Sequence, residues 1–262
     1  MIEFKGTGFT YDGDRFVLDG VDARIERGEF VVIVGPSGAG KTTLMRLICG
    51  LMTKTAGELS VVGLDVTEHP QAVQDLLSYM PQKFGLYEDL TVQENLDLYA
   101  DLHGVPQELR AKRFAHLLAM TELAPFTGRL AGKLSGGMKQ KLGLACTLVR
   151  SPKLLMLDEP TVGVDALSRR ELWQILQQLV REEHLSVFVS TAYMEEELRI
   201  ADNLGNYHWG RVRATALFDE MGNPFRVIGV IMDIDSDWRQ TYELRIKAER
   251  DSLTKLYNKN TG

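Results

Sequence analysis

The chain has 262 residues, of which 44% are hydrophobic and 25% charged, and its formal net charge at pH 7 is −6. This composition is typical of a globular protein, and the negative charge excludes a global basic field that recruits nucleic acid or anionic lipid. No apolar run approaches the roughly 20 residues of a membrane span, and residues 1–5 lack the apolar core of a signal peptide. These observations predict one large domain, with or without a smaller piece, in a soluble protein of the cytoplasm.

The first segment, residues 2–25, alternates apolar and polar positions and contains turn signals at Gly13-Asp14 and at residues 27–29. This pattern predicts an antiparallel hairpin region. Tyr11 lies about two dozen residues before the glycine-rich segment that follows. An aromatic side chain there suits stacking on a purine ring, although such a tyrosine, taken alone, is more often a core residue.

The glycine-rich segment, residues 35–43, stands between an apolar β-branched strand at 30–34 and a helix at 44–49. It matches the pattern G-x-x-x-x-G-K-[ST], in which glycines let backbone N–H groups surround phosphate oxygens at a helix N-terminus. Lys41 is expected to reach the β- and γ-phosphates, and Thr42 to hold Mg²⁺ through its hydroxyl. The alternative is an ordinary glycine-rich turn.

Residues 57–82 predict a strand at 58–62, a short helix near 70–75 and a second strand at 77–80. Pro81 ends the second strand, and Gln82 follows it. Open α/β sheets bind ligands at the carboxyl ends of their strands, so Gln82 is placed to meet Mg²⁺ or an attacking water. Without such context it is a polar loop residue.

Residues 91–150 predict a helical block with helices at 93–103 and 107–120 and a third that ends at Leu148. Thr91 and Glu94 have the spacing of a capping box at the start of the first helix. Ser135-Gly136-Gly137 opens the third helix. That start is either a second anion-binding helix N-terminus or a capping serine beside a flexible turn.

The strand at 154–158 is apolar and ends in Asp158, which Glu159 follows. Apolar strands of this kind suit a parallel sheet buried between helices. Asp158 is placed to coordinate Mg²⁺, and Glu159 to polarise a water aimed at a γ-phosphate. The alternative is a strand that ends in two solvated acids. A helix at 166–182, a strand at 186–190 and an acidic helix start at 193–197 are predicted to follow.

Together, the ordered motifs resemble the nucleotide-binding subunit of ABC transporters over about residues 2–203. The resemblance rests on five matched segments: the Walker A loop at Gly35–Thr43, the Q-loop glutamine Gln82, the signature at Leu134–Gln140, the Walker B strand Leu154–Asp158 with Glu159, and a D-loop at Val162–Asp165. Tyr11 falls where the family has its adenine-stacking aromatic residue. The signature and the stretch at 190–196 look most like drug-export ATPases.

The resemblance implies an α/β fold of P-loop NTPase type, with an antiparallel β subdomain and a helical subdomain at about 88–150. It implies an ATPase that uses ATP and Mg²⁺ and works as a head-to-tail dimer with a transmembrane permease, at the inner face of the cell membrane and without nucleic acid. The implied site residues are catalytic Glu159 and Gln82; nucleotide-binding Tyr11, Gly35, Pro36, Ser37, Gly38, Ala39, Gly40, Lys41, Thr42 and Thr43; metal-binding Thr42, Gln82 and Asp158; signature residues Leu134, Ser135, Gly136, Gly137 and Met138, which act on the second subunit's ATP; and Asp165 of the D-loop.

One position departs from the family pattern. The family usually carries a histidine that contacts the γ-phosphate two residues after the serine of the last strand. Here Ser190 leads to Ala192 at that position. Alanine cannot make that contact, so impaired hydrolysis is expected beside intact ATP binding.

The sequence changes character from about residue 205. Residues 206–236 resemble the last two strands of a PAS sensory domain, residues 237–250 predict a charged helix, and residues 251–258 resemble the opening of a diguanylate cyclase (GGDEF) domain. The expected division is therefore an ATPase domain at 1–205, a PAS-like hairpin at 206–236 and a linker helix with a truncated cyclase-like start at 237–262, as in a chimera. The alternative is a divergent C-terminus of an ABC subunit.

Two other functions stay open at this stage. One is an ABC ATPase that acts on the ribosome, which a basic linker between tandem modules would favour; no such linker is visible. The other is a signalling protein built on the PAS-like and cyclase-like pieces, against which the missing cyclase active-site loop argues.

Overall fold

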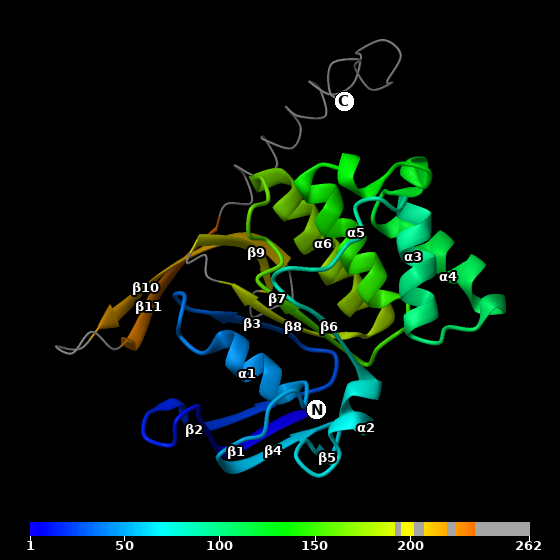
Figure 1. Ribbon diagram of the computed structural model, residues 1–262. Coiled ribbons are helices and arrows are strands. Elements are labelled where there is room, and N and C mark those ends of the chain that lie inside the picture. Colours follow the sequence, from blue (N-terminus) through cyan, green and yellow to red (C-terminus); the bar gives the residue numbers. More distant parts are fainter. Residues whose placement is uncertain (192–194, 202–206, 219–223, 234–262) are drawn as a thin grey trace. The chain divides into compact units, whose positions relative to one another are not determined.

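The computed structural model describes residues 1–191, 195–201, 207–218 and 224–233. The chain divides into two compact units, Met1–Ala192 and Tyr193–Gly262. The first unit contains an antiparallel sheet, a parallel sheet and a group of helices (Figure 1).

The first sheet is antiparallel, with strand order β2-β1-β4-β5. Its strands are β1 (Ile2–Thr10), β2 (Phe16–Ile25), β4 (Ala56–Val61) and β5 (Leu64–Asp65). The alternation of residues 2–25 thus formed the predicted hairpin, with irregular register between Phe4 and Thr10.

The second sheet is parallel, with strand order β3-β8-β7-β6. It contains β3 (Phe30–Val34), β6 (Leu77–Met80), β7 (Leu154–Asp158) and β8 (Ser186–Thr191). The carboxyl ends of β3, β6, β7 and β8 meet at one edge of this sheet, as parallel strands require. That edge carries the glycine-rich loop, Gln82, Asp158 and Ser190.

The helix α1 (Lys41–Ile48) packs between the two sheets. Its buried residues Met45, Leu47 and Ile48 share one core cluster with Ile2, Phe4 and Leu59 of the antiparallel sheet and with Met156 and Phe188 of the parallel sheet. This apolar layer fixes the start of α1 relative to the strand ends on which the site is built.

The remaining helices of the first unit are α2 (Pro70–Leu76), α3 (Val92–Leu102), α4 (Gln107–Met120), α5 (Gly136–Leu148) and α6 (Ala166–Glu183), with short 3₁₀ turns at Ala124–Phe126 and Ala131–Lys133. The Thr91–Glu94 capping box is confirmed: each side chain bonds the other's backbone N–H. None of the described helices is long and apolar enough to cross a membrane.

The second unit contains strands β9 (Glu195–Ala201), β10 (Tyr207–Phe218) and β11 (Pro224–Asp233), which pair antiparallel in the order β11-β10-β9. The acidic helix predicted from residue 193 was wrong over 195–201, which form a strand. Local propensity favoured a helix there, but pairing with β10 satisfies the backbone instead. The predicted charged helix at 237–250, the cyclase-like segment at 251–258 and Ala192 lie outside the described residues.

Candidate functional site

The glycine-rich loop joins β3 to α1, and its middle residues Ser37, Gly38 and Ala39 are exposed. Gly38 and Gly40 have φ angles of 83° and 84°, in the left-handed region that favours glycine. A Cβ atom on Gly40 would also lie 3.2 Å from Leu18 Cδ2. Both the backbone conformation and the space therefore require glycine where the loop enters the helix. The result is an exposed loop beside a helix N-terminus, which is an anion-binding arrangement.

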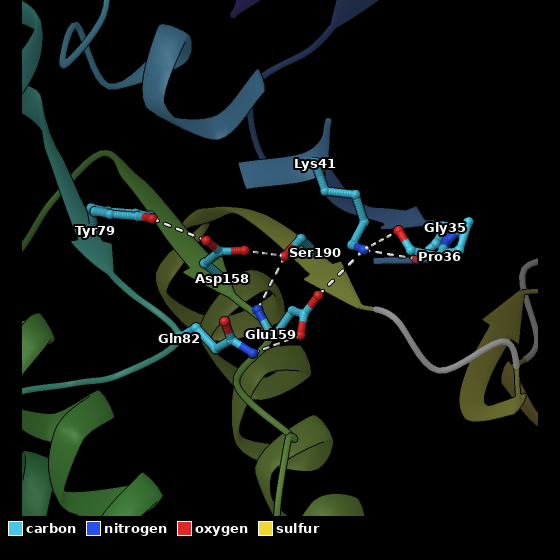
Figure 2. A network of polar contacts seen from close by, with 8 residues as sticks. All are labelled: Gly35, Pro36, Lys41, Tyr79, Gln82, Asp158, Glu159 and Ser190. Carbon is cyan, nitrogen blue, oxygen red and sulfur yellow. Dashed lines mark hydrogen bonds and ion pairs between the residues drawn. The ribbon is translucent and has the colours of Figure 1, made fainter. Parts of the chain in front are cut away.

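Lys41 is the first residue of α1, and its side chain is only 5% exposed. Its Nζ atom donates hydrogen bonds to the carbonyl oxygens of Gly35 and Pro36, at 2.7 and 3.1 Å. The same atom lies 3.3 Å from Glu159 Oε1 (Figure 2). The ammonium group is thus held at the mouth of the loop by two carbonyls and one carboxylate.

Glu159 follows β7 in a left-handed backbone conformation, with φ of 51°. Its N–H donates to both the carbonyl oxygen and the Oγ of Ser190, at 3.1 and 3.0 Å. Its carboxylate accepts a 3.0 Å hydrogen bond from Gln82 Nε2. The structure therefore brings Gln82, Lys41 and Glu159 together, although 118 positions separate Lys41 from Glu159 in the printed sequence.

Asp158 is 2% exposed, and both of its carboxylate oxygens accept hydrogen bonds. Ser190 Oγ donates to Oδ1 at 2.5 Å, and the Tyr79 hydroxyl donates to Oδ2 at 3.1 Å (Figure 2). Burial, together with the nearby Asp158 carboxylate, raises the pKa of Tyr79 well above its ordinary value. The tyrosine hydroxyl therefore stays protonated and donates at any physiological pH.

Tyr11 lies beside the same loop. Its hydroxyl is 3.1 Å from the Oγ1 of Thr43, and its ring packs edge-on against Phe9 with centroids 4.8 Å apart. The residue is nevertheless 65% exposed. The ring is thus largely accessible next to the glycine-rich loop, which suits stacking on a base.

The donors present fit Mg²⁺ that arrives with a phosphate ligand. Thr42, Gln82 and Asp158 offer a hydroxyl, an amide and a carboxylate oxygen, which are hard ligands of the type Mg²⁺ takes beside phosphate oxygens and water. Within the residues that the structure describes, no group of three or more His, Cys, Asp or Glu side chains forms a dedicated metal cage.

The signature residues lie at a different helix start. Ser135 and Gly136 are exposed, Leu134 is buried, and Ser135 Oγ accepts the Met138 N–H at 3.3 Å as the N-cap of α5. Gly137 packs against α6 so closely that a Cβ there would lie 2.2 Å from Ser168 Oγ.

Asp165 caps α6 at this contact. Its carboxylate accepts from the N–H groups of Leu167 and Ser168 and from the Ser168 hydroxyl, at 3.1, 3.0 and 2.7 Å. These hydrogen bonds, led by the Ser168 backbone, lower the pKa of Asp165. The α5 and α6 starts thus support each other.

A pocket of about 390 Å³ lies beside strand β6. Its lining residues come from the turn after α1, from α2, β6 and the loop that follows β6, and from the C-terminal parts of α3 and α5. They include Leu51, Tyr79, Phe84, Tyr99, His103 and Arg150. Leu51 is 53% exposed, and Tyr99 stacks on Phe84 with centroids 5.0 Å apart. Tyr79 therefore borders this pocket and contacts Asp158.

Two residues of the network were not predicted: Tyr79 and Ser190. The pairing register of the parallel sheet identifies both residues as neighbours of Asp158. Ser190 pairs with Asp158 itself, and Tyr79 pairs with Met156, two residues before Asp158. A strand pattern read one segment at a time does not show which ends are neighbours.

A comparison with protein families matches residues 18–162 to the ABC transporter family. The chain is 56% identical over 205 residues to the probable multidrug ABC transporter ATP-binding protein YbhF of Escherichia coli. The aligned segment covers 78% of this chain and 35% of that protein. It thus spans about a third of that relative's length. It is 37% identical over 209 residues to the daunorubicin resistance ATP-binding protein DrrA3 of Streptomyces coeruleorubidus, covering 80% of this chain and 66% of the relative.

A solved structure with a similar fold is the dimeric, post-hydrolysis state of the ATP-binding cassette MJ0796 bound to ADP and phosphate. It matches with a TM-score of 0.63 and 30% identity, over 73% of this chain and 88% of that one.

Proposed function

The chain belongs to the ABC transporter family of ATP-binding proteins, and from that premise we propose that it binds and hydrolyses ATP to power an export-type transporter. The observation that carries the proposal is the convergence of Lys41, Gln82 and Glu159 at the mouth of an anion-binding loop. The relatives YbhF and DrrA3 are named for multidrug transport and daunorubicin resistance, which supports export of drug-like molecules.

In this proposal each group has a separate task. The loop's N–H groups and Lys41 bind and orient the β- and γ-phosphates, and Tyr11 stacks on the adenine. Thr42, Asp158 and Gln82 hold Mg²⁺, which neutralises charge on the phosphates when it is bound. Glu159 accepts a hydrogen bond from the attacking water and takes its proton on a carboxylate oxygen.

Lys41 and Glu159 change partners in this proposal. Both are buried, and they form an ion pair with each other at 3.3 Å. The charged oxygens of the γ-phosphate are stronger hydrogen-bond acceptors for Lys41 than the loop carbonyls are. When ATP binds, Lys41 therefore turns to the phosphate, and the Glu159 carboxylate is free to bind the attacking water.

The second half of the site is proposed to come from another ABC subunit. Ser135 and Gly136 are exposed at a helix N-terminus, where Ser135 Oγ accepts the Met138 N–H of the same helix. A head-to-tail dimer places this N-terminus over ATP bound to the partner's loop. The dimeric MJ0796 cassette supports this arrangement.

A transmembrane permease is the second proposed partner. The helical block and the segment around Gln82 would contact it, and the half-exposed apolar wall of the pocket at Leu51, Phe84 and Tyr99 suits a permease segment. This partner would hold the chain at the inner face of the membrane.

Two features of the C-terminal part enter as proposals from sequence alone. Ala192, in place of the usual histidine, is proposed to slow hydrolysis without weakening ATP binding. Residues 206–236 and 237–262 are proposed to derive from a PAS-to-cyclase junction. The antiparallel pairing of β10 with β11 supports a hairpin there. Truncation after about residue 216 should leave ATP affinity unchanged. A loss of ATP affinity in the truncated chain would show that the tail is part of the ATPase fold.

The test of the proposed function is nucleotide-dependent dimerisation. Purified Glu159→Gln should form a dimer with ATP and Mg²⁺ in size-exclusion chromatography, because water attack is lost while binding is kept. With ADP it should remain monomeric. A chain that fails to bind ATP at all would contradict the proposal.

A further inference from the structure

The two adjacent acidic residues of the site both form a hydrogen bond with the same serine side chain, Asp158 through its carboxylate and Glu159 through its backbone N–H. Ser190 is fully buried, and its Oγ donates to Asp158 Oδ1 while it accepts the N–H of Glu159. A serine hydroxyl has one proton, so the bond to Asp158 uses its whole donor capacity. One side chain therefore contacts both the carboxylate of Asp158 and the backbone of Glu159, whose φ of 51° lies in the strained left-handed region.

Asp158 is also held from the opposite side. It stands at the end of β7, which lies between β6 and β8 in the parallel sheet. Tyr79 of β6 donates to Oδ2, and Ser190 of β8 donates to Oδ1 (Figure 2). Two donors from the two flanking strands restrict rotation of the carboxylate about its χ angles and leave the remaining lone pairs for another ligand.

We propose that Tyr79 and Ser190 are positioning residues that fix the Asp158 carboxylate for Mg²⁺, and that Ser190 also fixes the Glu159 backbone. The inference rests on the proposed function, because it takes Asp158 as a group that meets the metal. Hydrogen-bond partners behind a metal-binding carboxylate control its orientation, and their loss typically costs about 10–100-fold in metal affinity or activity.

Ser78 supplies a matched control. It precedes Tyr79 in β6 and is buried, but its Oγ has no hydrogen-bond partner in the described structure. Removing this hydroxyl leaves no group of the network unpaired. Ser78→Ala therefore reproduces the loss of a buried hydroxyl in the same strand without touching Asp158.

The experiment uses the full chain with two separate readouts. The first is the affinity of a fluorescent ATP analogue in excess EDTA, and the second is the affinity for Mn²⁺, a spectroscopic substitute for Mg²⁺, measured by electron paramagnetic resonance at saturating ATP. Tyr79→Phe and Ser190→Ala should weaken Mn²⁺ binding by about 10-fold and leave the EDTA affinity unchanged. Ser190→Thr, which keeps the hydroxyl, should restore Mn²⁺ binding, and Ser78→Ala should match the wild type.

The inference is overturned if Tyr79→Phe binds Mn²⁺ as tightly as Ser78→Ala does, or if both readouts fall together in folded protein. If Ser190→Ala does not fold, Tyr79→Phe alone decides, since it removes a single oxygen and keeps the ring. Failure of the wild-type chain to bind the ATP analogue would instead defeat the proposed function, so the two failures are distinguishable.

Discussion

The starts of α1 and α5 are both glycine-containing helix N-termini, but the polar groups around them differ in their contacts. Around α1, Lys41 and Gln82 each contact the carboxylate of Glu159, and the carboxylate of Asp158 accepts a hydrogen bond at each of its two oxygens. Around α5, Ser135 and Gly136 are exposed, and the tightest contact is the close approach of Gly137 to Ser168. The charged groups at the α1 start therefore pair within the chain, whereas the α5 start exposes a helix N-terminus that is shaped by close packing against α6.

The largest expected effect is at Lys41. Lys41→Ala removes the buried cation between the loop carbonyls and Glu159, so ATP affinity should fall by about 100-fold or more. Titration with a fluorescent ATP analogue measures it. Lys5→Ala is the matched control, because Lys5 is 59% exposed and lies 3.5 and 3.7 Å from Glu3 and Glu58, so its loss should change ATP affinity little. Equal affinities of the two variants would contradict the assigned role of the network.

The α5 start is tested next by Gly137→Ala. Its new Cβ would lie 2.2 Å from Ser168 Oγ and 2.4 Å from Ser168 Cβ, so α5 and α6 must separate. We expect a loss of roughly 1–3 kcal/mol in the free energy of unfolding, as for other overpacked contacts. Urea denaturation gives the value. Gly128→Ala, where no atom lies within 4 Å, should unfold like the wild type.

A smaller effect is expected at Tyr11, at the edge of the charged network. Tyr11→Ala removes the ring and should weaken ATP binding by about 1 kcal/mol, the lower end of the range for stacking of a base on an aromatic side chain. Tyr11→Phe keeps the ring and loses only the bond to Thr43. It should bind ATP nearly as the wild type does, and an equal loss in both variants would assign the effect to the hydroxyl.

The smallest expected effect concerns the pH dependence of the α6 cap. The folded pKa of Asp165 lies below its ordinary value of 3.8, so the capping carboxylate stabilises the fold above that pH and the stabilisation is lost as pH falls below it. Asp165→Ala should lower the free energy of unfolding by about 1 kcal/mol at pH 7, as for other caps.

That difference should shrink over the acidic range below about pH 4, as the carboxylate is protonated. Thermal unfolding of both proteins across this range is the measurement. Asp89→Ala, at an exposed acid whose side chain has no partner in the described structure, should show no such trend.

Most of the fold was predictable because local patterns and packing agree in it. The predicted strands at 30–34, 77–80 and 154–158 have the observed bounds, as does the helix at 107–120. Strand β9 was missed because its pairing with β10 is a non-local gain that no local pattern records. The ion pair of Lys41 with Glu159 and the two donors to Asp158 depend on strand order, which the sequence of one chain does not state.

The central claim is that an ATP site is made of the α1 start of one subunit and the α5 start of another. The direct test mixes two variants, Lys41→Ala and Ser135→Arg, each also carrying Glu159→Gln. Neither variant alone should form a dimer with ATP and Mg²⁺ in size-exclusion chromatography, because each lacks one half of every site. A one-to-one mixture should form a dimer, since one of its two sites then has an intact loop from one chain and an intact signature from the other. A mixture that stays monomeric, or a single variant that dimerises alone, would contradict the account.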